Sequence, residues 1–393
     1  MNKNKTVYFS GLNGLRAIAA LSVVVHHITL ALKEFNLDPY IFGAIKDGSP
    51  RGLSLGGFGV TIFFVLSGFL ITYLLQTEKE LSDINIKKFY IRRILRIWPL
   101  YYLYLAIAVI VIIIFGFNLN LKSLFLYIFY AANIPFILGK DLPFLAHYWS
   151  LGVEEQFYLF WPWVNKKSGS LLTFILIFII VLFGSKVILH LFYPNSLLES
   201  VIHVTRFHCM MIGGAGAILY KRENKLFLTV TDNKLTQLLC WSILFLTAVN
   251  KYHLASFIDN EIIACVSLCL IIGQIRVNNR VINLETKVFD FLGRISYGIY
   301  VTHLLLIFFI AKLLNLVTIY GPLKYIMVYV VVLSTTIIFS YLSYNYIEKY
   351  FLNFKKKMDF INPESAEKYV EKGWDEEKQM YYYLVYFNKE QKS

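Results

Sequence analysis

Long apolar runs constrain the fold of this chain more than any other feature of its sequence. Residues 171–183 read LLTFILIFIIVLF and residues 103–115 read LYLAIAVIVIIIF, with no charged side chain in either run. Each run continues through apolar flanks to about the 20 residues that a helix needs to cross a bilayer core. Because lipid offers no partner to an open backbone, such segments cross a membrane as helices. The pattern predicts an all-α, polytopic membrane helix bundle.

The balance of residue types supports this prediction. Apolar residues make up 57% of the 393 residues, whereas soluble domains contain about 45–50%. The net charge of +13 would by itself also suit a nucleic-acid-binding protein. The basic residues cluster in short segments between apolar runs, as the positive-inside rule expects, so we expect a lipid bilayer and no nucleic acid as partner. The four cysteines lie in apolar stretches without metal-ligand spacing to histidines, so we expect no metal.

Hydropathy predicts ten membrane-spanning segments. They lie at about 12–32, 55–75, 97–117, 145–164, 170–192, 202–220, 235–250, 257–275, 291–314 and 323–347. The apolar stretch 121–139 is interrupted by Asn133, Pro135 and Gly139, and we expect a re-entrant or interfacial element there.

An even number of spans places both termini on one side. With both termini in the cytoplasm, most lysines and arginines between spans also lie inside, as the positive-inside rule requires. We expect a transmembrane domain over residues 1–352. The charged, tyrosine-rich residues 353–393 would form a small cytoplasmic tail, with Lys355–Lys357 at the anionic lipid surface.

Arg16 and His27 both fall in the first span. Ionisable residues inside a membrane cost several kcal/mol and therefore mark functional sites. Eleven residues apart, these two lie within about 20° of one helical face and ~16 Å apart along the axis. Coenzyme A has a matching polarity, with phosphates at one end and a thioester at the other, and a deep neutral imidazole can accept a proton from a hydroxyl. Alternatively, His27 bonds a backbone carbonyl and Arg16 extends to the interface.

Two further segments carry polar groups, and the second of them lies at the predicted cytoplasmic mouth. Glycines beside Ser67 would let helices approach closely in lipid, and Ser67 could also offer a hydroxyl to a ligand. Arg93 and Arg96 are three residues apart and share a helical face. Two guanidiniums on one face can bind phosphate oxygens. The alternative is that both arginines are ordinary positive-inside anchors.

Residues 147–158 read HYWSLGVEEQFY and place Glu154 and Tyr158 on one helical face. A buried carboxylate must be paired, so we expect Glu154 to bond His27, which would orient a base as the third member of a catalytic triad does, or an arginine. The alternative is that Glu154 and Glu155 cap the N-terminus of the helix.

Other charged and polar residues lie in the later spans. Arg206 needs a carboxylate partner, for which Glu154 is a candidate, and Lys186 has no obvious one. Tyr297, Tyr300 and His303 drift off one helical face, so at most two of them meet one site.

These segments together resemble the integral-membrane acyltransferase 3 family over about residues 8–352. The motifs that carry the resemblance are Arg16 with His27, Ser67-Gly68-Phe69, Arg93 with Arg96, Trp149-Ser150-Leu151 with Glu154 and Tyr158, and Ser296-Tyr297 with His303. Members of this family include bacterial O-acetyltransferases of surface polysaccharides.

The resemblance implies roles for these residues. His27 would be the essential histidine, Arg16 its partner, and Glu154 the motif acid. Arg93 and Arg96 would contact acyl-coenzyme A. The family ends its domain with glutamate, arginine and proline, where this chain has Glu348-Lys349-Tyr350. Some members also carry an extracytoplasmic hydrolase-like domain. None is recognisable here, so we expect the chain to acylate its acceptor directly or through a partner.

The sequence therefore predicts a bacterial inner-membrane O-acyltransferase that uses acetyl-coenzyme A as its donor. The acceptor would be a hydroxyl of a surface glycan or of a lipid-linked sugar, and envelope-assembly partners are compatible with this function. We assign the donor to Arg16, Ser67, Arg93 and Arg96, catalysis to His27 with Arg16 and Glu154, and the acceptor to Tyr158, Arg206, Tyr297 and His303. Ten spans with buried charges would also suit a transporter or flippase of lipid-linked saccharides, or a scaffold in which His27 is dispensable.

Overall fold

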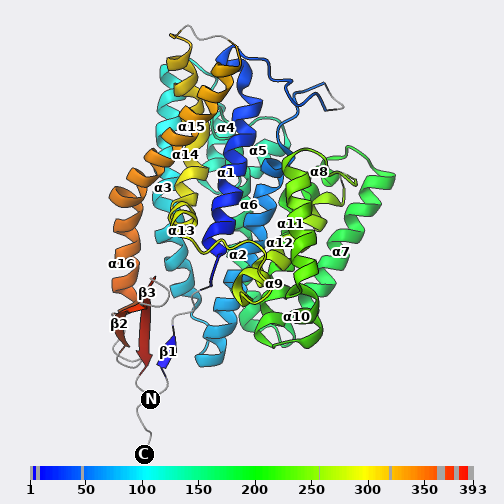
Figure 1. The fold of residues 1–393 in the computed structure, drawn as a ribbon, viewed down its shortest axis with the longest axis vertical. Helices are drawn as coiled ribbons and strands as arrows, with labels where there is room; N and C mark the ends of the chain where they lie inside the picture. Colours follow the sequence, from blue (N-terminus) through cyan, green and yellow to red (C-terminus); the bar gives the residue numbers. More distant parts are fainter. Residues whose placement is uncertain are drawn as a thin grey trace, which may run out of the picture.

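Helices dominate the computed structural model (Figure 1). It describes residues 3–5, 9–45, 48–255, 257–317, 321–360, 368–375 and 380–387, with side chains for those between 9 and 354. The first half contains α1 (Leu12–Leu30), α2 (Ser54–Leu81), α3 (Ile86–Ile114), α4 (Leu121–Ile128), α5 (Asn133–Ile137), α6 (Trp149–Lys167) and α7 (Leu171–Phe192). The second half contains α8 (Leu197–Thr205), α9 (Phe207–Lys221), α10 (Lys225–Thr231), α11 (Lys234–Ala248), α12 (Asp259–Arg276), α13 (Lys287–Arg294), α14 (Ser296–Leu314), α15 (Pro322–Ser343) and α16 (Lys349–Phe360).

Seven helical segments in the described part of the chain are long and apolar enough to cross a membrane. They are α1, α2, α3, α7, α8 with α9, α14, and α15 with its continuation to Phe354. The prediction of an all-α, multi-pass membrane protein is therefore confirmed. Helices also occupy the predicted spans at 145–164, 235–250 and 257–275, as α6, α11 and α12. These three helices are not among the seven segments that are long and apolar enough to cross a membrane, and the total of ten spans stays a prediction.

The interrupted stretch 121–139 forms two short helices, α4 and α5, instead of one span. The chain turns between them at Tyr130, whose φ of 55° lies in the left-handed region. Gln156 of α6 donates to the Tyr130 carbonyl (3.0 Å) and to Asn133 Oδ1 (2.8 Å). Irregular backbone at membrane depth requires such protein partners, and α6 supplies them here.

Small residues bring α1, α2 and α9 into close contact. A Cβ on Gly68 of α2 would lie 1.9 Å from the Met210 carbonyl oxygen of α9, and one on Gly213 would lie 2.1 Å from that of Val65. On the other side of α2, a Cβ on Gly59 would lie 2.7 Å from the Ala19 carbonyl oxygen of α1. The predicted role in helix packing is confirmed for Gly68, the glycine next to Ser67. Close packing of this core fixes the position of Ser67.

The two ends of the described chain meet in a small antiparallel sheet of order β1-β3-β2. It consists of β1 (Lys3–Lys5), β2 (Lys368–Asp375) and β3 (Met380–Phe387), with Lys3 opposite Tyr386 and Lys368 opposite Phe387. The sheet lies beyond α16, at the end of the bundle where α2 ends (Figure 1). The predicted tail thus holds strands as well as the end of α16, and its position in the cytoplasm stays a prediction.

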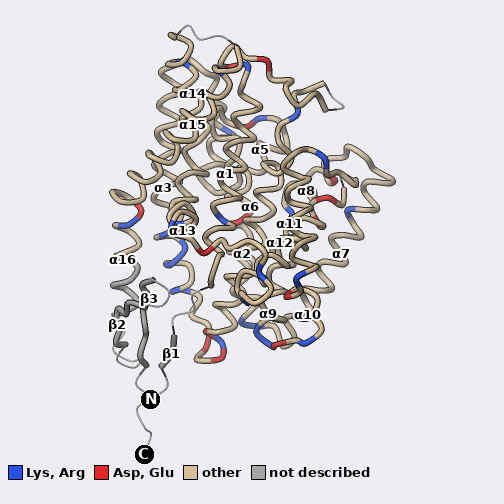
Figure 2. The backbone as a smooth tube through the Cα atoms, in the orientation of Figure 1, with Lys and Arg blue, Asp and Glu red and all other residues tan. Residues whose placement is uncertain are grey.

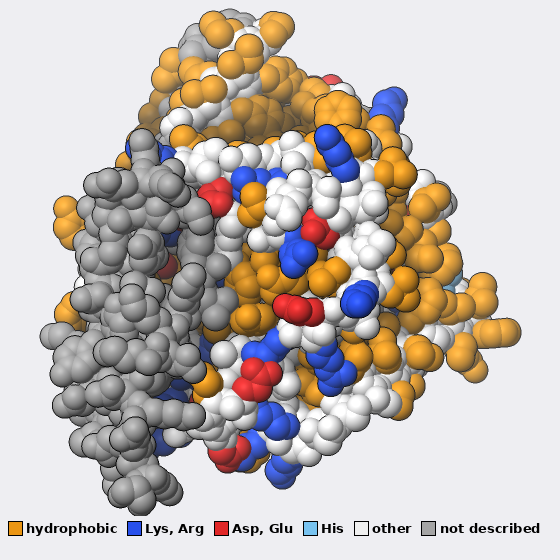
Figure 3. Space-filling view, turned by 60° about the horizontal axis from the view of Figure 1, so that its bottom comes forward, with side chains coloured by type: hydrophobic (Ala, Val, Ile, Leu, Met, Phe, Trp, Pro, Cys, Tyr) orange, Lys and Arg blue, Asp and Glu red, His pale blue; other side chains and the backbone are white. Residues whose placement is uncertain are grey.

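Charged residues concentrate at this same end of the bundle. Figure 2 shows many lysines and arginines around α9, α10 and α13, whereas long stretches of α7, α14 and α15 carry none. Figure 3 views that end of the molecule and shows charged side chains gathered around apolar ones, with apolar side chains along the flanks. An apolar flank and a charged end are what a membrane-embedded bundle requires.

Candidate active site

A cavity of about 210 Å³ lies among α1, α2, α3, α6 and α14. It brings together seven of the ten residues that the sequence assigned to the site. These are Arg16, Ser67, Arg93, Arg96, Glu154, Tyr158 and Tyr297. The remaining three, His27, Arg206 and His303, are not in the described lining. Segments far apart in the sequence therefore converge on one polar cavity, and three predicted residues lie elsewhere.

Glu154 accepts two hydrogen bonds in the cavity wall. The hydroxyls of Ser67 and Tyr158 both donate to its Oε1. Tyr158 is one helical turn away on α6, so its contact follows from helix periodicity, whereas the contact with Ser67 joins α6 to α2. The prediction that Glu154 pairs with His27 is wrong, because these two hydroxyls are its partners and His27 bonds other groups. Since α6 starts at Trp149 and its first turn has no acidic residue, Glu154 does not cap it either.

Three guanidiniums face the same cavity. Arg93 lies over the ring of Tyr158, with its Cζ 5.3 Å from the ring centroid, and over that of Phe89 at 5.6 Å. Arg16 donates to Asn13 Oδ1 at 3.2 Å. Within the described part of the chain, no carboxylate lies within ion-pair distance of Arg16, Arg93 or Arg96. Glu154 and Glu155 also line the cavity, so three guanidiniums face two carboxylates, and the excess of guanidiniums leaves this region able to bind an anion.

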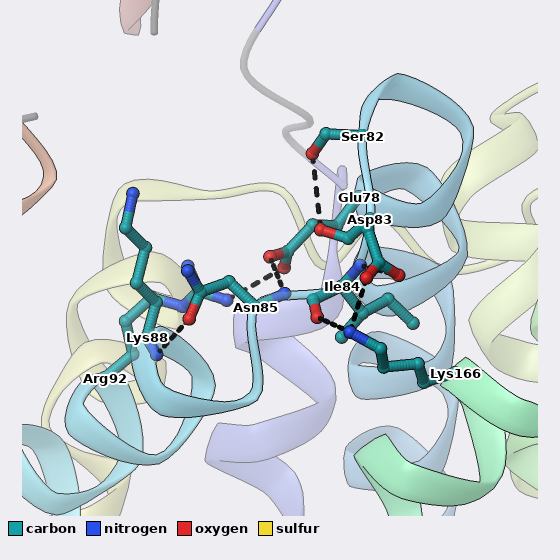
Figure 4. A network of polar contacts seen from close by, with 8 residues as sticks. All are labelled: Glu78, Ser82, Asp83, Ile84, Asn85, Lys88, Arg92 and Lys166. Atoms are coloured by element: carbon teal, nitrogen blue, oxygen red, sulfur yellow. Dashed lines mark hydrogen bonds and ion pairs between the residues drawn. The ribbon is translucent and has the colours of Figure 1, made fainter. Parts of the chain in front are cut away.

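The loop between α2 and α3 fixes the helix that carries these arginines (Figure 4). Asn85 caps α3 by accepting from the Lys88 backbone N–H at 2.9 Å. Glu78 of α2 accepts from the Asn85 backbone N–H and pairs with Arg92, both at 3.0 Å. Arg92 therefore stabilises the loop, whereas Arg93, the next residue, lines the cavity.

Lys166 at the end of α6 ties down the same loop. Its ammonium donates to the Asp83 carboxylate and, at 3.1 Å, to the Ile84 carbonyl (Figure 4). The hydrogen bond from Lys166 holds the pKa of the Asp83 carboxyl below its ordinary value. Through this contact α6, which carries Glu154, is joined to the start of α3, which carries Arg93.

A second polar cluster, formed by three histidines, lies beside the cavity. His303 Nε2 lies 3.1 Å from His27 Nδ1. The ring of His147 lies 4.6 Å, centroid to centroid, from that of His303. We call His27, His147 and His303 the histidine cluster. His303 thus contacts the predicted base directly.

Tyr300 and Phe63 separate the cavity from the histidine cluster. Both residues line the cavity, and their ring centroids are 5.9 Å apart. The Tyr300 ring also lies 5.9 Å from that of His303, and its hydroxyl contacts Ser150 Oγ at 2.5 Å. We call Phe63 and Tyr300 the aromatic layer. Arg16 lines the cavity, whereas His27 is not in its described lining and contacts His303, which Tyr300 also contacts.

Arg206 lies apart from both groups. It ends α8 with a φ of 43° and donates to the His203 carbonyl (3.0 Å) and to Thr61 Oγ1 (3.2 Å). Its Cζ lies 5.3 Å from the ring centroid of Trp149. The prediction that Glu154 is its partner is wrong: among the described residues no carboxylate pairs with Arg206. A neutral hydroxyl, a carbonyl and an aromatic ring take that place.

Lys186 has a partner that the sequence analysis did not find. Its Nζ lies 2.7 Å from Glu261 Oε1, and His208 Nε2 lies 3.0 Å from the same oxygen. The three residues come from α7, α12 and α9, and Lys186 is buried. The sequence analysis gave Glu261 no role, and the pairing was missed because it joins α7 to α12.

Two other contributors were missed for a similar reason. His147 opens the motif of residues 147–158 without an assigned role, and Tyr300 was considered only for its helical face. Their contacts with His303 and Ser150 depend on how α6 meets α14, which no spacing within one helix reveals. Within the described ranges, no group of three or more histidine, cysteine, aspartate or glutamate side chains has the arrangement of a metal site.

The fold and the cavity define a multi-pass membrane protein with an internal polar cavity that three arginines line. Comparison with known proteins gives the family: the chain belongs to the acyltransferase 3 family, described as "Acyltransferase domain", which it matches over residues 9–345. The resemblance noted in the sequence is therefore confirmed.

Three relatives illustrate the similarity. "Peptidoglycan O-acetyltransferase OatA" of Listeria monocytogenes serovar 1/2a is 28% identical, over 90% of this chain and 59% of that protein. "Putative O-acetyltransferase" of Staphylococcus aureus (strain COL) is 28% identical, over 88% and 57%. "Putative peptidoglycan O-acetyltransferase YrhL" of Bacillus subtilis (strain 168) is 29% identical, over 75% and 48%. The chain thus spans less than two thirds of the length of these relatives. No solved structure is significantly similar.

Proposed function

We propose that the protein is an O-acyltransferase of the bacterial plasma membrane that moves an acetyl group from acetyl-coenzyme A to a hydroxyl of a cell-wall glycan or its lipid-linked precursor. Family membership supports acyl transfer. The acceptor is suggested by relatives named as peptidoglycan O-acetyltransferases. We place both termini in the cytoplasm, where the donor is found, because of the positive-inside rule.

The observation that carries the choice of donor is the group of guanidiniums in the cavity. Arg93 and Arg96 line it together with Arg16, and none has an ion-pair partner among the described carboxylates. Coenzyme A carries several phosphate charges, which such guanidiniums bind well. The cavity volume of about 210 Å³ is below the ~300–1,000 Å³ of sites that enclose a whole drug-sized ligand. It therefore suits the thin acyl-pantetheine arm, with the nucleotide at the mouth.

Acyl transfer to a hydroxyl requires a base, and the proposed base, His27, lies beyond the aromatic layer. His27 accepts the proton of the acceptor hydroxyl while the hydroxyl oxygen forms a bond to the acyl carbonyl carbon. The carbon–sulfur bond of the thioester then breaks, and the thiolate leaves with the proton that His27 has taken. The products are an acyl ester and free coenzyme A. For the thioester to reach His27, the side chains of the aromatic layer have to move.

Ser67, Tyr158 and Tyr297 complete the donor cavity, with Glu154 holding the first two hydroxyls. Arg206 is assigned to the acceptor. It lies on Trp149 near the start of α6 and has no carboxylate among its described partners. An uncompensated cation at membrane depth is costly, and an anionic or hydroxyl-rich acceptor would stabilise it.

Reconstitution of the chain in proteoliposomes tests this function. With acetyl-coenzyme A labelled in the acetyl group and a peptidoglycan disaccharide or its lipid-linked form, we expect label on the glycan and an equal amount of free coenzyme A. His27→Ala should abolish both without changing the amount of folded protein.

Movement of a lipid-linked sugar across the bilayer without consumption of acetyl-coenzyme A would instead establish a flippase. Normal acetylation by His27→Ala would show that His27 is not the base.

A further inference from the structure

The hydrogen bonds around the histidine cluster fix where each proton lies. His303 Nδ1 lies 2.6 Å from the Tyr300 carbonyl oxygen, which can only accept. The proton of a neutral His303 ring is therefore on Nδ1, and its Nε2 carries a lone pair. That lone pair lies 3.1 Å from His27 Nδ1.

The same reasoning applies to His27. Its Nδ1 lies 2.9 Å from the Val23 carbonyl oxygen, again an acceptor only. His27 Nδ1 thus carries the proton and shares it between the Val23 carbonyl and His303 Nε2, both of which accept. The remaining nitrogen of His27, Nε2, is left with a free lone pair. This is the atom that can take a proton from a hydroxyl.

The geometry points to His303 as the positioning residue of the transfer site: together with the Val23 carbonyl it accepts from His27 Nδ1 and so leaves His27 Nε2 as the basic atom. This inference rests on the proposed function and names one more residue for it. The sequence analysis had assigned His303 to the acceptor and Glu154 to this orienting role. The contacts give the orienting role to His303 instead, because Glu154 bonds Ser67 and Tyr158.

A second imidazole suits this position better than a carboxylate would. An aspartate or glutamate beside His27 would be an isolated negative charge in an apolar region, which costs several kcal/mol unless paired. The neutral His303 still accepts the hydrogen bond, and that bond strengthens when His27 becomes positively charged during transfer. The carboxylate of a catalytic triad has the same task of fixing the tautomer.

His147 keeps the ring of His303 in place. Its Nε2 lies 3.1 Å from the Val301 carbonyl oxygen of α14. Its ring packs on that of His303 with a centroid distance of 4.6 Å. Three elements of the fold therefore determine the orientation of the His27 ring: α1, α14 and the turn before α6.

Two substitutions at His303 separate positioning from packing. His303→Gln places an amide oxygen about where Nε2 lies and can still accept from His27 Nδ1. His303→Leu fills similar space without an acceptor. We expect His303→Gln to keep kcat within about tenfold of wild type. His303→Leu should lose about 10²–10³-fold in kcat, with the KM for acetyl-coenzyme A within about threefold, since a wrong tautomer costs up to ~10⁴-fold in a triad.

His190→Leu is a matched control. His190 lies at the end of α7, away from the site, and bonds Glu199 of α8. It should leave kcat unchanged. Equal losses in His303→Gln and His303→Leu would overturn the inference.

A second readout does not depend on activity. In protein with ¹⁵N-labelled histidine, the His27 signals are identified by their loss in His27→Asn. We expect a protonated Nδ1 and an unprotonated Nε2 in wild type, and a smaller share of this tautomer in His303→Leu, where only the Val23 carbonyl still accepts from Nδ1. A wild-type His27 protonated on Nε2 would overturn the inference even if transfer is observed. Absence of transfer by wild type with the expected tautomer would contradict only the proposed function.

Discussion

Ser67 on α2 and Glu154 on α6 are 87 residues apart in the sequence and share a hydrogen bond in the cavity wall, where Tyr158 donates to the same carboxylate oxygen. Arg93 in turn lies on the ring of Tyr158. Glu154 therefore positions a tyrosine that supports an arginine of the proposed donor site. This relationship places Glu154 in the wall of the cavity rather than beside His27.

Replacement of Glu154 by alanine should act on donor binding. Without the carboxylate, Tyr158 loses its acceptor and Arg93 its fixed support, so we expect the KM for acetyl-coenzyme A to rise about tenfold, equivalent to ~1.4 kcal/mol. Glu154→Gln can accept the same hydrogen bonds and should stay within about threefold of wild type. Steady-state kinetics in proteoliposomes measures both. A collapse of kcat at unchanged KM would show that Glu154 acts on the reacting atoms.

Arg93→Gln and Arg96→Gln should each weaken donor binding. A hydrogen bond to a charged group contributes about 1.5–3 kcal/mol, which corresponds to a 10- to 100-fold rise in KM for acetyl-coenzyme A. The effect should be smaller for a donor analogue that lacks the nucleotide phosphates.

The matched control for these variants is Arg92→Gln. Arg92 is the neighbour of Arg93 but pairs with Glu78 in the loop before α3. This partly exposed pair should contribute less than about 1 kcal/mol to stability, and its loss should leave the KM within about twofold. A rise in KM as large as that of Arg93→Gln would show that the two arginines act only through overall charge.

Gly68→Ala should destabilise the contact between α2 and α9. The added methyl would lie 1.9 Å from the Met210 carbonyl oxygen, whereas Gly57 has no atom within 4 Å of such a methyl. Overpacking of this kind costs about 1–3 kcal/mol, so we expect a lower melting temperature in detergent for Gly68→Ala. Gly57→Ala should melt like wild type. Equal melting temperatures would show that the helices separate without cost.

Lys186→Met should destabilise the half of the bundle formed by α7, α9 and α12. Loss of one partner from a buried ion pair costs about 3–5 kcal/mol, because the other charge stays buried. Here Glu261 would keep only His208, at 3.0 Å. The double variant Lys186→Met with Glu261→Gln should recover much of the lost stability in a thermal melt. If the double variant is less stable than Lys186→Met, the pair is not the source of the effect.

Much of the fold could be predicted from the sequence because the membrane imposes simple rules on it. Long apolar runs predicted the helices α1, α2, α3 and α14, and at least one end of each predicted span lies within a few residues of the observed helix end. The glycines of α2 correctly indicated close helix packing. Polar residues inside apolar runs led to seven residues of one cavity. In each case one physical constraint, the absence of water, acts on a local stretch of chain.

Partners across helices could not be predicted in the same way. Glu154 was expected beside His27 or an arginine, and Lys186 was left without a partner. Their contacts with Ser67 and Glu261 depend on the depth and rotation of each helix relative to its neighbours. Packing of glycines against backbone sets these quantities for α2 and α9, and a helix considered alone contains no information about them.

The aromatic layer has a consequence for the cell as well as for the reaction. A bundle that kept a continuous water-filled path from the cytosol to the outer leaflet would let protons through and dissipate the electrochemical gradient. Phe63 and Tyr300 pack against each other in the cavity wall, and Tyr300 also contacts His303. Two large rings at this place leave less room for water between the cavity and the histidine cluster.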